Sequence, residues 1–348
     1  MTANPDVLPA HRFDEARLAD WLAANLPGFA GPLTVSEFKG GQSNPTYRLT
    51  TPSASYVLRR KPPGTLLPSA HAVDREYRML SALAGTGVPV PRTYLLCEDA
   101  AVVGTMFYVM DCLDGRIFFD PRLPEVEDVA ERGAMFDAMN VVIAALHTVD
   151  YKAVGLSDFG REGGYVARQI GRWSKQYKAS ETETIDAMER LMAWLPDHLP
   201  ESDETTLVHG DYRLDNLVFH PTEPRVIGVL DWEIATLGNP LADFAYHVMA
   251  WRVSPAEFRG LRDVDIAALG IPDEASYVAA YARRTGRDAL PDWEFYIAYN
   301  LFRMAAILQG IMGRVRDGTA ANPEAQRMGA LVRPLAELAW AQAAKIGR

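Results

Sequence analysis

The sequence is poor in cysteine, in long apolar runs and in clustered positive charge. Only two of its 348 residues are cysteines, Cys97 and Cys112, and both lie in apolar stretches. A disulfide framework is therefore excluded, and reduced core thiols are favoured. No apolar stretch reaches the ~18 residues that a membrane span requires, and the first residues lack the basic and apolar segments of a secretory signal. We therefore expect a cytoplasmic protein without a membrane partner.

The charge balance and the length set further bounds. The formal net charge is −10 and the sequence contains no dense Lys/Arg run, so nucleic acid is not the expected partner. Acidity alone does not identify a cationic substrate, because many enzymes are acidic for solubility. A chain of this length with 48% hydrophobic residues can bury a large core and suits two lobes better than one compact domain.

The most informative segment covers residues 207–233. Asp211 and Asn216 are five positions apart between short apolar runs, and Asp231 follows a second β-like run. Phosphoryl transfer from ATP needs a carboxylate for the attacking hydroxyl, together with an amide oxygen and a second carboxylate for Mg²⁺. The pattern His-x-Asp, four residues, Asn, strand, Asp matches the protein-kinase signature. It predicts a phosphotransferase with Asp211 as the catalytic base and Asn216 and Asp231 as Mg²⁺ ligands.

His209-Gly210-Asp211, Asn216 and the Asp231-Trp232-Glu233 stretch resemble the signature of the aminoglycoside phosphotransferase-like family of small-molecule kinases. The resemblance extends over about residues 35–315. A finer resemblance is to the branch that also forms the kinase-like part of some acyl-CoA dehydrogenase fusion proteins. It rests on residues 39–46 and 56–64, on Arg168-Gln169 and on Arg172-Trp173.

This resemblance and the periodicity of the chain predict an α+β, two-lobed, protein-kinase-like fold. We expect a small β-rich N-lobe over residues 1–110, a linker over 111–115 and a larger, mainly helical C-lobe over 116–348. The N-lobe order is β-β-β-α-β-β after a first helix. The expected segments are a helix over 13–26, strands over 33–38, 46–50 and 56–60, a helix over 71–84, and strands over 93–97 and 106–113.

In the N-lobe, a cation and a helix carboxylate are needed beside the α- and β-phosphates. By resemblance the cation is Arg59, where most kinases have Lys, and strand alternation puts Val57 and Arg59 on one face. Glu76 is the expected partner, with a solvated helix charge as the alternative. Because Arg acts through a planar fork rather than a point charge, Lys61 stays open as the alternative cation.

Further nucleotide contacts are expected from a polar turn at residues 40–44 and from the linker region at residues 110–113. The turn is rich in residues that tolerate unusual backbone angles and would cover the phosphates with backbone N–H groups. The linker would offer backbone groups to the adenine edge, although Met110 could equally be a core residue. The sequence does not predict whether the nucleotide is ATP or GTP. The predicted cofactor-binding residues are Gly40, Gly41, Ser43, Asn44, Arg59, Glu76, Met110 and Cys112.

Four further residues, three of them within or close to residues 207–233, have competing interpretations. His209 is favoured as a structural residue that braces the loop. Asp243 would either cap a helix or, by resemblance, accept hydrogen bonds from the loop backbone. Glu233 is either a water-mediated metal contact or a solvated carboxylate. Asp158 belongs to an Asp-Phe-Gly sequence, but it precedes the His-Gly-Asp loop and follows no β-like run, so we interpret it as a loop residue.

The acceptor is expected to be a hydroxyl-bearing small molecule. Arg168 and Arg172 share a helical face beside Trp173, and two arginines suit a carboxylate or CoA phosphates. Solvated arginines on an amphipathic helix are the alternative. Arg303 and Arg314 are weaker candidates of the same kind. Resemblance favours a hydroxy acid or hydroxyacyl-CoA. The alternatives are aminoglycoside O-phosphotransfer and a nucleotide-binding regulator without turnover. The sequence does not predict the oligomeric state.

Overall fold

The structure is a computed structural model that describes residues 6–38, 44–63, 71–318 and 325–346. Contacts divide the chain into two compact units, and each is described by itself. The first comprises residues 1–116 and 217–235, and the second comprises 117–216 and 236–348. Within the described ranges, no helix is both long enough and apolar enough to cross a membrane.

The first unit is built on an antiparallel five-stranded sheet with the order β1-β2-β3-β5-β4. Its strands are β1 Thr34–Glu37, β2 Thr46–Thr50, β3 Ser55–Arg60, β4 Thr93–Cys97 and β5 Phe107–Asp111, with a separate pair, β7 Leu217–Phe219 and β8 Val226–Val229. Its helices are a 3-10 helix Pro9–His11, α1 Glu15–Asn25, α2 Val73–Leu83 and α3 Ala100–Val103.

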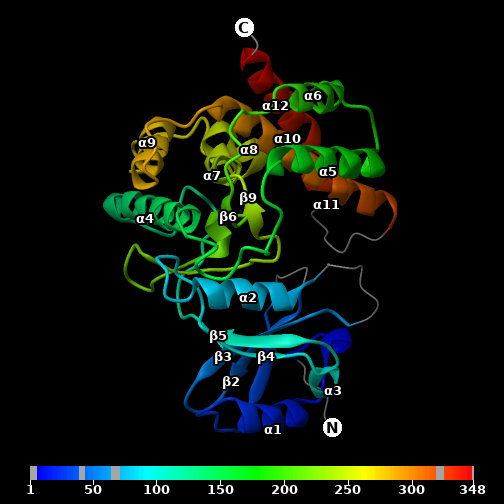
Figure 1. The fold of residues 1–348 in the computed structure, drawn as a ribbon, viewed down its shortest axis with the longest axis vertical. Helices are drawn as coiled ribbons and strands as arrows, with labels where there is room; N and C mark the ends of the chain where they lie inside the picture. Colours follow the sequence, from blue (N-terminus) through cyan, green and yellow to red (C-terminus); the bar gives the residue numbers. More distant parts are fainter. Residues whose placement is uncertain (1–5, 39–43, 64–70, 319–324, 347–348) are drawn as a thin grey trace. The chain divides into compact units, whose positions relative to one another are not determined.

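The two faces of this sheet have different roles. Helices α1 and α3 pack on one face, where Leu22 and Val102 join Leu58 in an apolar core. Helix α2 covers the other face (Figure 1). Because side chains alternate along a strand, Arg60 of β3 points into the core side, where its guanidinium donates to the carbonyl of Val103 over 2.6 Å. The neighbouring Arg59 is therefore left on the α2 side.

The second unit is mainly helical and contains the 209–216 loop. The elements are α4 Val129–His147, α5 Tyr165–Ser180, α6 Asp186–Asp197, β6 Thr206–Val208, a 3-10 helix Leu214–Asn216, β9 Thr236–Gly238, α7 Pro240–Val248, a 3-10 helix Met249–Arg252, α8 Pro255–Phe258, α9 Glu274–Arg284, α10 Trp293–Arg316, α11 Ala325–Gly329 and α12 Val332–Ile346. Helix α10 packs against α5, α7 and α12, and most of its side chains are buried. Strands β6 and β9 pair antiparallel, so the loop after β6 starts beside the segment that leads into α7.

The predicted α+β architecture is confirmed, and most predicted elements of the N-lobe match within two residues. Helix α3 was missed because it has only four residues. The predicted lobe boundaries stay a prediction, and the contact division differs from them in one respect, since it groups 217–235 with the first unit. Arg116 and Phe219 exchange two backbone hydrogen bonds of 2.8 Å, and a Cβ at Gly115 would overlap the carbonyl oxygen of Phe219.

Candidate functional site

The 209–216 loop brings together the two residues that its spacing singled out. The Asn216 amide nitrogen donates to the backbone carbonyl of Asp211 over 2.8 Å and to Asp211 Oδ2 over 3.1 Å. The fully buried His209 ring accepts the backbone N–H of Asp211 through Nδ1 at 3.2 Å. His209 is therefore a structural part of the loop, as predicted.

Asp243 of α7 holds the backbone of this loop. Its carboxylate accepts the N–H groups of His209 and Gly210, both over 2.8 Å, and lies 3.2 Å from His147 Nε2. Burial raises the pKa of Asp243, but the hydrogen bond from His147 and the loop partners lower it by more, so the net pKa lies below the ordinary value. The carboxylate therefore stays charged while it fixes the loop.

The alternative interpretation of Asp243 as a helix cap is wrong. The cap of α7 is Asn239, whose side-chain oxygen accepts the N–H groups of Leu241 and Ala242. Asp243 lies one helical turn after this cap, and its buried carboxylate contacts the loop instead of the end of the helix. The hydrogen bonds to the loop agree with the role that the family resemblance implied for Asp243.

Three side chains hold the carboxylate of Asp211. Tyr246 donates its hydroxyl to Oδ1 over 2.5 Å, and Arg213 Nε forms an ion pair with the same oxygen at 3.0 Å. Asn216 occupies Oδ2. Sequence reasoning missed Tyr246. A signal was present, because Tyr246 follows Asp243 by three residues and so shares its face of the helix.

Arg303 of α10 is buried and contacts the loop, and the weaker prediction that it belongs to an acceptor site stays a prediction. Its guanidinium donates to the carbonyl of Gly210 over 2.5 Å. It also lies over the ring of Tyr246, 4.6 Å from the centroid, and over the ring of Trp173 at 5.5 Å. With 5% of its surface exposed, Arg303 is a buried cation of the second unit.

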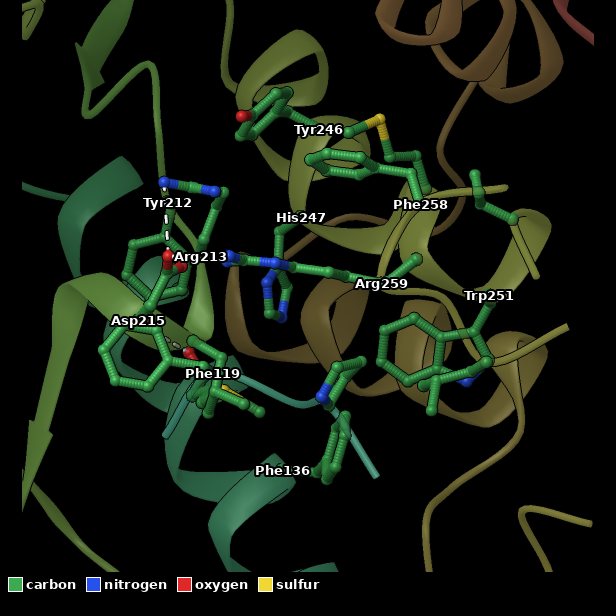
Figure 2. A pocket seen from close by; sticks show the side chains of 17 residues that line it. Phe119, Phe136, Tyr212, Arg213, Asp215, Tyr246, His247, Trp251, Phe258 and Arg259 are labelled. Carbon is green, nitrogen blue, oxygen red and sulfur yellow. Dashed lines mark hydrogen bonds and ion pairs between the residues drawn. The ribbon is translucent and has the colours of Figure 1, made fainter. Parts of the chain in front are cut away.

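A mostly apolar cavity of about 80 Å³ lies beside the loop. Figure 2 shows aromatic rings and two arginines around it. Asp215, the one carboxylate in its lining, is already paired with Arg213 at 3.3 Å and with Arg259 at 3.1 Å. The lining residues are Phe119, Pro121, Phe136, Met139, Tyr212, Arg213, Leu214, Asp215, Tyr246, His247, Met249, Ala250, Trp251, Val253, Phe258, Arg259 and Leu261.

The predicted acceptor residues on α5 are absent from the lining of the cavity beside the 209–216 loop and from that of two further pockets in the described part of the chain. Arg168 donates to the backbone carbonyls of Gly163 and Arg161. Arg172 is exposed and lies over the Trp173 ring at 5.3 Å. Trp173 is 9% exposed. An acceptor role for these three residues stays a prediction, although the guanidinium of Arg168 is already engaged by the turn before α5.

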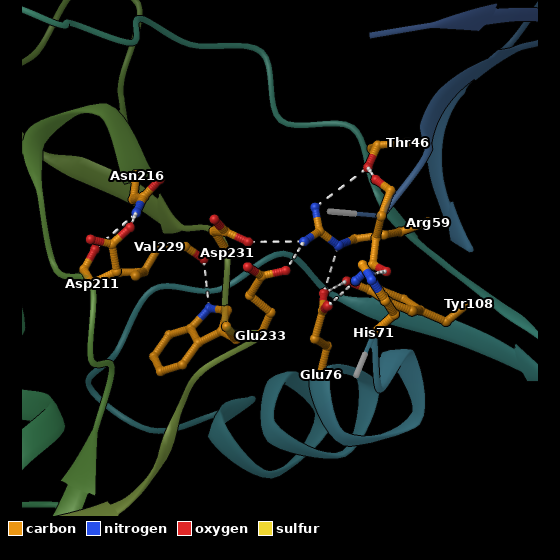
Figure 3. A network of polar contacts seen from close by, with 12 residues as sticks. Thr46, Arg59, His71, Glu76, Tyr108, Asp211, Asn216, Val229, Asp231 and Glu233 are labelled. Atoms are coloured by element: carbon orange, nitrogen blue, oxygen red, sulfur yellow. Dashed lines mark hydrogen bonds and ion pairs between the residues drawn. The ribbon is translucent and has the colours of Figure 1, made fainter. Parts of the chain in front are cut away.

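The first unit contains a second polar network, centred on Arg59 (Figure 3). Arg59 Nε lies 2.7 Å from Glu76, and its Nη2 lies 2.9 Å from Asp231 and 3.7 Å from Glu233. Burial lowers the pKa of Arg59, but these carboxylates raise it by more. The predicted ion pair between Arg59 and Glu76 is present, whereas Lys61 lies 3.4 Å from Asp74. Of the two candidate cations, Arg59 is thus the one that pairs with Glu76.

Glu76 is fixed on both oxygens. Asn44 donates to Oε1 over 2.8 Å, Tyr108 donates to Oε2 over 3.0 Å, and His71 Nδ1 lies 3.1 Å from the Asn44 oxygen. The burial of Glu76, which is 2% exposed, raises its pKa, while Arg59 and the hydrogen bonds oppose that rise. Asn44 thus braces the carboxylate that orients Arg59.

The remaining predicted nucleotide contacts belong to the expected turn at residues 40–43 and to the end of β5. Gly40, Gly41 and Ser43 lie outside the described residues. Met110 is buried in β5 between Val57 and Thr93 of the neighbouring strands, and Cys112 is half-buried just after that strand. Their contact with an adenine edge stays a prediction.

Asn216 and Asp231 have donor groups that suit Mg²⁺. Asn216 uses its amide nitrogen toward Asp211, which leaves its carbonyl oxygen as the donor for a cation. Asp231 follows β8 with a φ of 64°, and two hydrogen bonds of the Trp232 residue fix this segment. In the described ranges, no group of three or more His, Cys, Asp or Glu side chains is arranged to hold a metal alone. A metal bound to either residue would therefore need phosphate oxygens and water as further ligands.

Comparison with known proteins decides the family. The model of the phosphotransferase enzyme family matches residues 34–299. The chain belongs to this family. A crystal structure of a Ralstonia eutropha protein, provisionally named an aminoglycoside phosphotransferase, is 56% identical with a TM-score of 0.89, and the match covers 96% of this chain and 99% of that one. The expectation of a phosphotransferase is confirmed.

Two further comparisons bear on the fold and on the finer resemblance. Aminoglycoside phosphotransferase APH(4)-Ia, in complex with AMP-PNP and hygromycin B, matches with a TM-score of 0.59 over 93% of this chain and 98% of its own at 15% identity, which shows the fold alone. Mouse acyl-CoA dehydrogenase family member 10 is 49% identical over 91% of this chain and 30% of its own length. Rat family member 11 is 44% identical over 95% of this chain and 43% of its own. The chain thus spans less than half of these relatives.

Proposed function

We propose that this protein transfers the γ-phosphate of ATP to a hydroxyl group of a small molecule. The observation that carries the proposal is the direct contact between Asp211 and Asn216 in a buried loop that Asp243 holds by two hydrogen bonds. Asp211 would orient the attacking hydroxyl and accept its proton. A rigid carboxylate suits this role, because in-line attack depends on the position of the hydroxyl oxygen.

Arg59 and Glu76 would serve the nucleotide. Because Glu76 holds the Arg59 guanidinium at 2.7 Å, the cation is positioned before the α- and β-phosphates arrive, which limits reorganisation on binding. Asn216 and Asp231 would each supply an oxygen to Mg²⁺, which neutralises phosphate charge when bound. These roles combine the observed contacts in each unit with the chemistry of the family.

For the acceptor, we propose a hydroxy acid or a hydroxyacyl-CoA. The cavity beside Asp211 is apolar, and Asp215 at its edge is already neutralised by Arg213 and Arg259. An apolar chain gains free energy in such a place, whereas a polycation would meet two guanidinium groups. The relatives named as acyl-CoA dehydrogenase family members are consistent with this class of acceptor.

Aminoglycoside O-phosphotransfer is the second candidate, because the Ralstonia protein that is 56% identical carries that provisional name. The two candidates differ in the charge of the acceptor. An aminoglycoside would require unpaired carboxylates, and Asp215 is already paired through Oδ2 with two arginines, Arg213 and Arg259. We therefore place the hydroxy acid class first.

A screen of ATP consumption tests the proposal. Purified protein with Mg²⁺ is offered hydroxyacyl-CoAs, hydroxy acids, sugars, amino alcohols and aminoglycosides, with ATP and with GTP. ADP release is followed, and mass spectrometry identifies the phosphorylated product. Transfer to a hydroxy acid or its CoA ester supports the proposal. Transfer to kanamycin-type compounds with inert hydroxy acids would select the second candidate, and nucleotide binding without any transfer would indicate a regulator.

A further inference from the structure

Tyr246 reaches the carboxylate of Asp211 from a different element of the second unit. It lies on α7, three residues after Asp243, and its hydroxyl donates to Asp211 Oδ1 over 2.5 Å. Asp243 thus fixes the backbone of the loop while Tyr246 fixes the side chain of Asp211. Both contacts come from one face of one helix, so a single rigid body sets the position of the loop and the orientation of its carboxylate.

The side-chain contacts of Asp211 are distributed unevenly between its two oxygens. Oδ1 contacts Tyr246 and Arg213, whereas the described contact of Oδ2 is with Asn216 at 3.1 Å. A carboxylate oxygen offers about two lone-pair directions. Oδ1 is therefore the more tightly held oxygen, and Oδ2, with one longer hydrogen bond, is the better placed to accept a further donor.

Arg303 holds Tyr246 in this arrangement. Its guanidinium lies 4.6 Å from the centre of the Tyr246 ring and donates to the carbonyl of Gly210 at 2.5 Å. Loop and tyrosine are therefore tied to the same cation of α10, which is favourable for a buried guanidinium over an aromatic face. Burial and the charge of Asp211 raise the pKa of Tyr246 above its ordinary value, so the phenol keeps its proton and acts as a fixed donor.

We propose that Tyr246 is a positioning residue for phosphoryl transfer, which holds Asp211 through Oδ1 so that the acceptor hydroxyl delivers its proton to Oδ2. This inference rests on the proposed function. In the step, the acceptor O–H bond breaks and its proton goes to Oδ2. The acceptor oxygen bonds to the γ-phosphorus, and the bond to the β-phosphate oxygen breaks to release ADP. Tyr246 loses no proton.

The substitution Tyr246→Phe tests this role. It removes the hydroxyl and leaves the ring under Arg303, so packing is retained. We expect kcat for phosphoryl transfer to fall about 10- to 100-fold, while KM for ATP changes less than about twofold. The ratio of phosphorylated acceptor to ADP should also fall, because attack by water on ATP depends less on orientation than attack by a bound acceptor. A purely structural role would lower the amount of active protein and leave this ratio unchanged.

The matched control is Tyr177→Phe, which removes one fully buried hydroxyl from α5 and leaves the contacts of Asp211 in place. Its kcat and its transfer ratio should equal those of the wild-type protein. If Tyr246→Phe does not fold, 3-fluorotyrosine at position 246 retains the donor and should retain transfer within about threefold. A Tyr246→Phe protein with the wild-type kcat and ratio overturns the inference alone. A wild-type protein that transfers to no acceptor removes the proposed function and this inference with it.

Discussion

The polar centres of the two units are built in opposite ways. In the first unit, one guanidinium, Arg59, lies among three carboxylates, Glu76, Asp231 and Glu233. In the second unit, one carboxylate, Asp211, accepts hydrogen bonds from the neutral Tyr246 and Asn216 and forms an ion pair with Arg213. The first centre is thus formally negative, and the second is close to neutral.

This difference assigns different chemistry to the two centres. A formally negative cluster gains from a further cation, which suits Asp231 as a proposed metal ligand. A single carboxylate held by donors, with Oδ2 the less tightly held oxygen, suits the reception of a proton. The predictions below test this division, in order of decreasing effect.

The largest effect is expected for Asp211→Ala. Without the carboxylate the acceptor hydroxyl loses its orientation and its proton acceptor, so we expect turnover to fall at least about 10³-fold, or ~4 kcal/mol in the barrier. ATP affinity, measured by calorimetry, should stay within about twofold. Asp158→Ala, which removes an exposed carboxylate from the 157–160 turn, is the control and should be fully active. Retention of more than about a tenth of the rate by Asp211→Ala would exclude Asp211 as the base.

The next effect concerns Arg59. Arg59→Ala leaves Glu76 buried without its cation, which should cost about 3–5 kcal/mol in the free energy of unfolding and weaken ATP binding. Arg59→Lys should cost less, because a point charge still faces Glu76. Urea denaturation and calorimetry with ATP measure both quantities.

Lys61→Ala is the control for Arg59. Its half-exposed pair with Asp74 at 3.4 Å should contribute less than about 1 kcal/mol. If Lys61→Ala abolished ATP binding and Arg59→Ala did not, the assignment of the cation would be reversed.

A third effect is the acid sensitivity of the second unit. His247 is buried against the Tyr277 hydroxyl at 2.8 Å, and burial lowers its pKa from the ordinary 6.5 to about 4, with Asp243 opposing that change. The unfolded chain therefore binds a proton at a higher pH than the folded chain does. The contribution of neutral His247 to the free energy of unfolding is fully present above about pH 6.5. It is lost, by roughly 3 kcal/mol, as the pH drops toward 4.

Urea denaturation of the wild-type protein and of His247→Gln at several pH values measures this contribution. Gln can still pair with the Tyr277 hydroxyl but does not titrate. The free energy of unfolding of the variant should therefore fall less steeply between pH 6.5 and 4.5. Parallel curves for the two proteins would show that His247 does not contribute.

The smallest effect separates two locations for the acceptor. Phe119 lines the apolar cavity and is 62% exposed. Phe119→Ala should raise KM for the acceptor about three- to tenfold, or ~1 kcal/mol of lost apolar contact. Arg172→Ala should change KM less than about twofold. The opposite result would favour the site on α5 that the sequence predicted.

The sequence by itself determined the family, the α+β architecture and several local arrangements. A spacing of five positions from Asp211 to Asn216 suffices to bring their side chains together in a short loop, and strand alternation suffices to separate Arg59 from Arg60. These relations depend on backbone geometry over a few residues. The pair of Arg59 and Glu76 was predictable for a similar reason, because a helix that follows a sheet covers one of its faces.

Only the tertiary structure decided the surroundings of Asp211 and the position of the apolar cavity. Tyr246 and Arg303 lie 35 and 93 residues from the loop groups that they contact, and such partners follow from how α7 and α10 pack. Tertiary structure likewise decided the contacts of Arg168. Its spacing from Arg172 suggested a pair that binds an anion, whereas its guanidinium donates to two backbone carbonyls. Residue type and spacing predict which groups a side chain can bind, but the packing of the helices determines which of those groups it contacts in the folded protein.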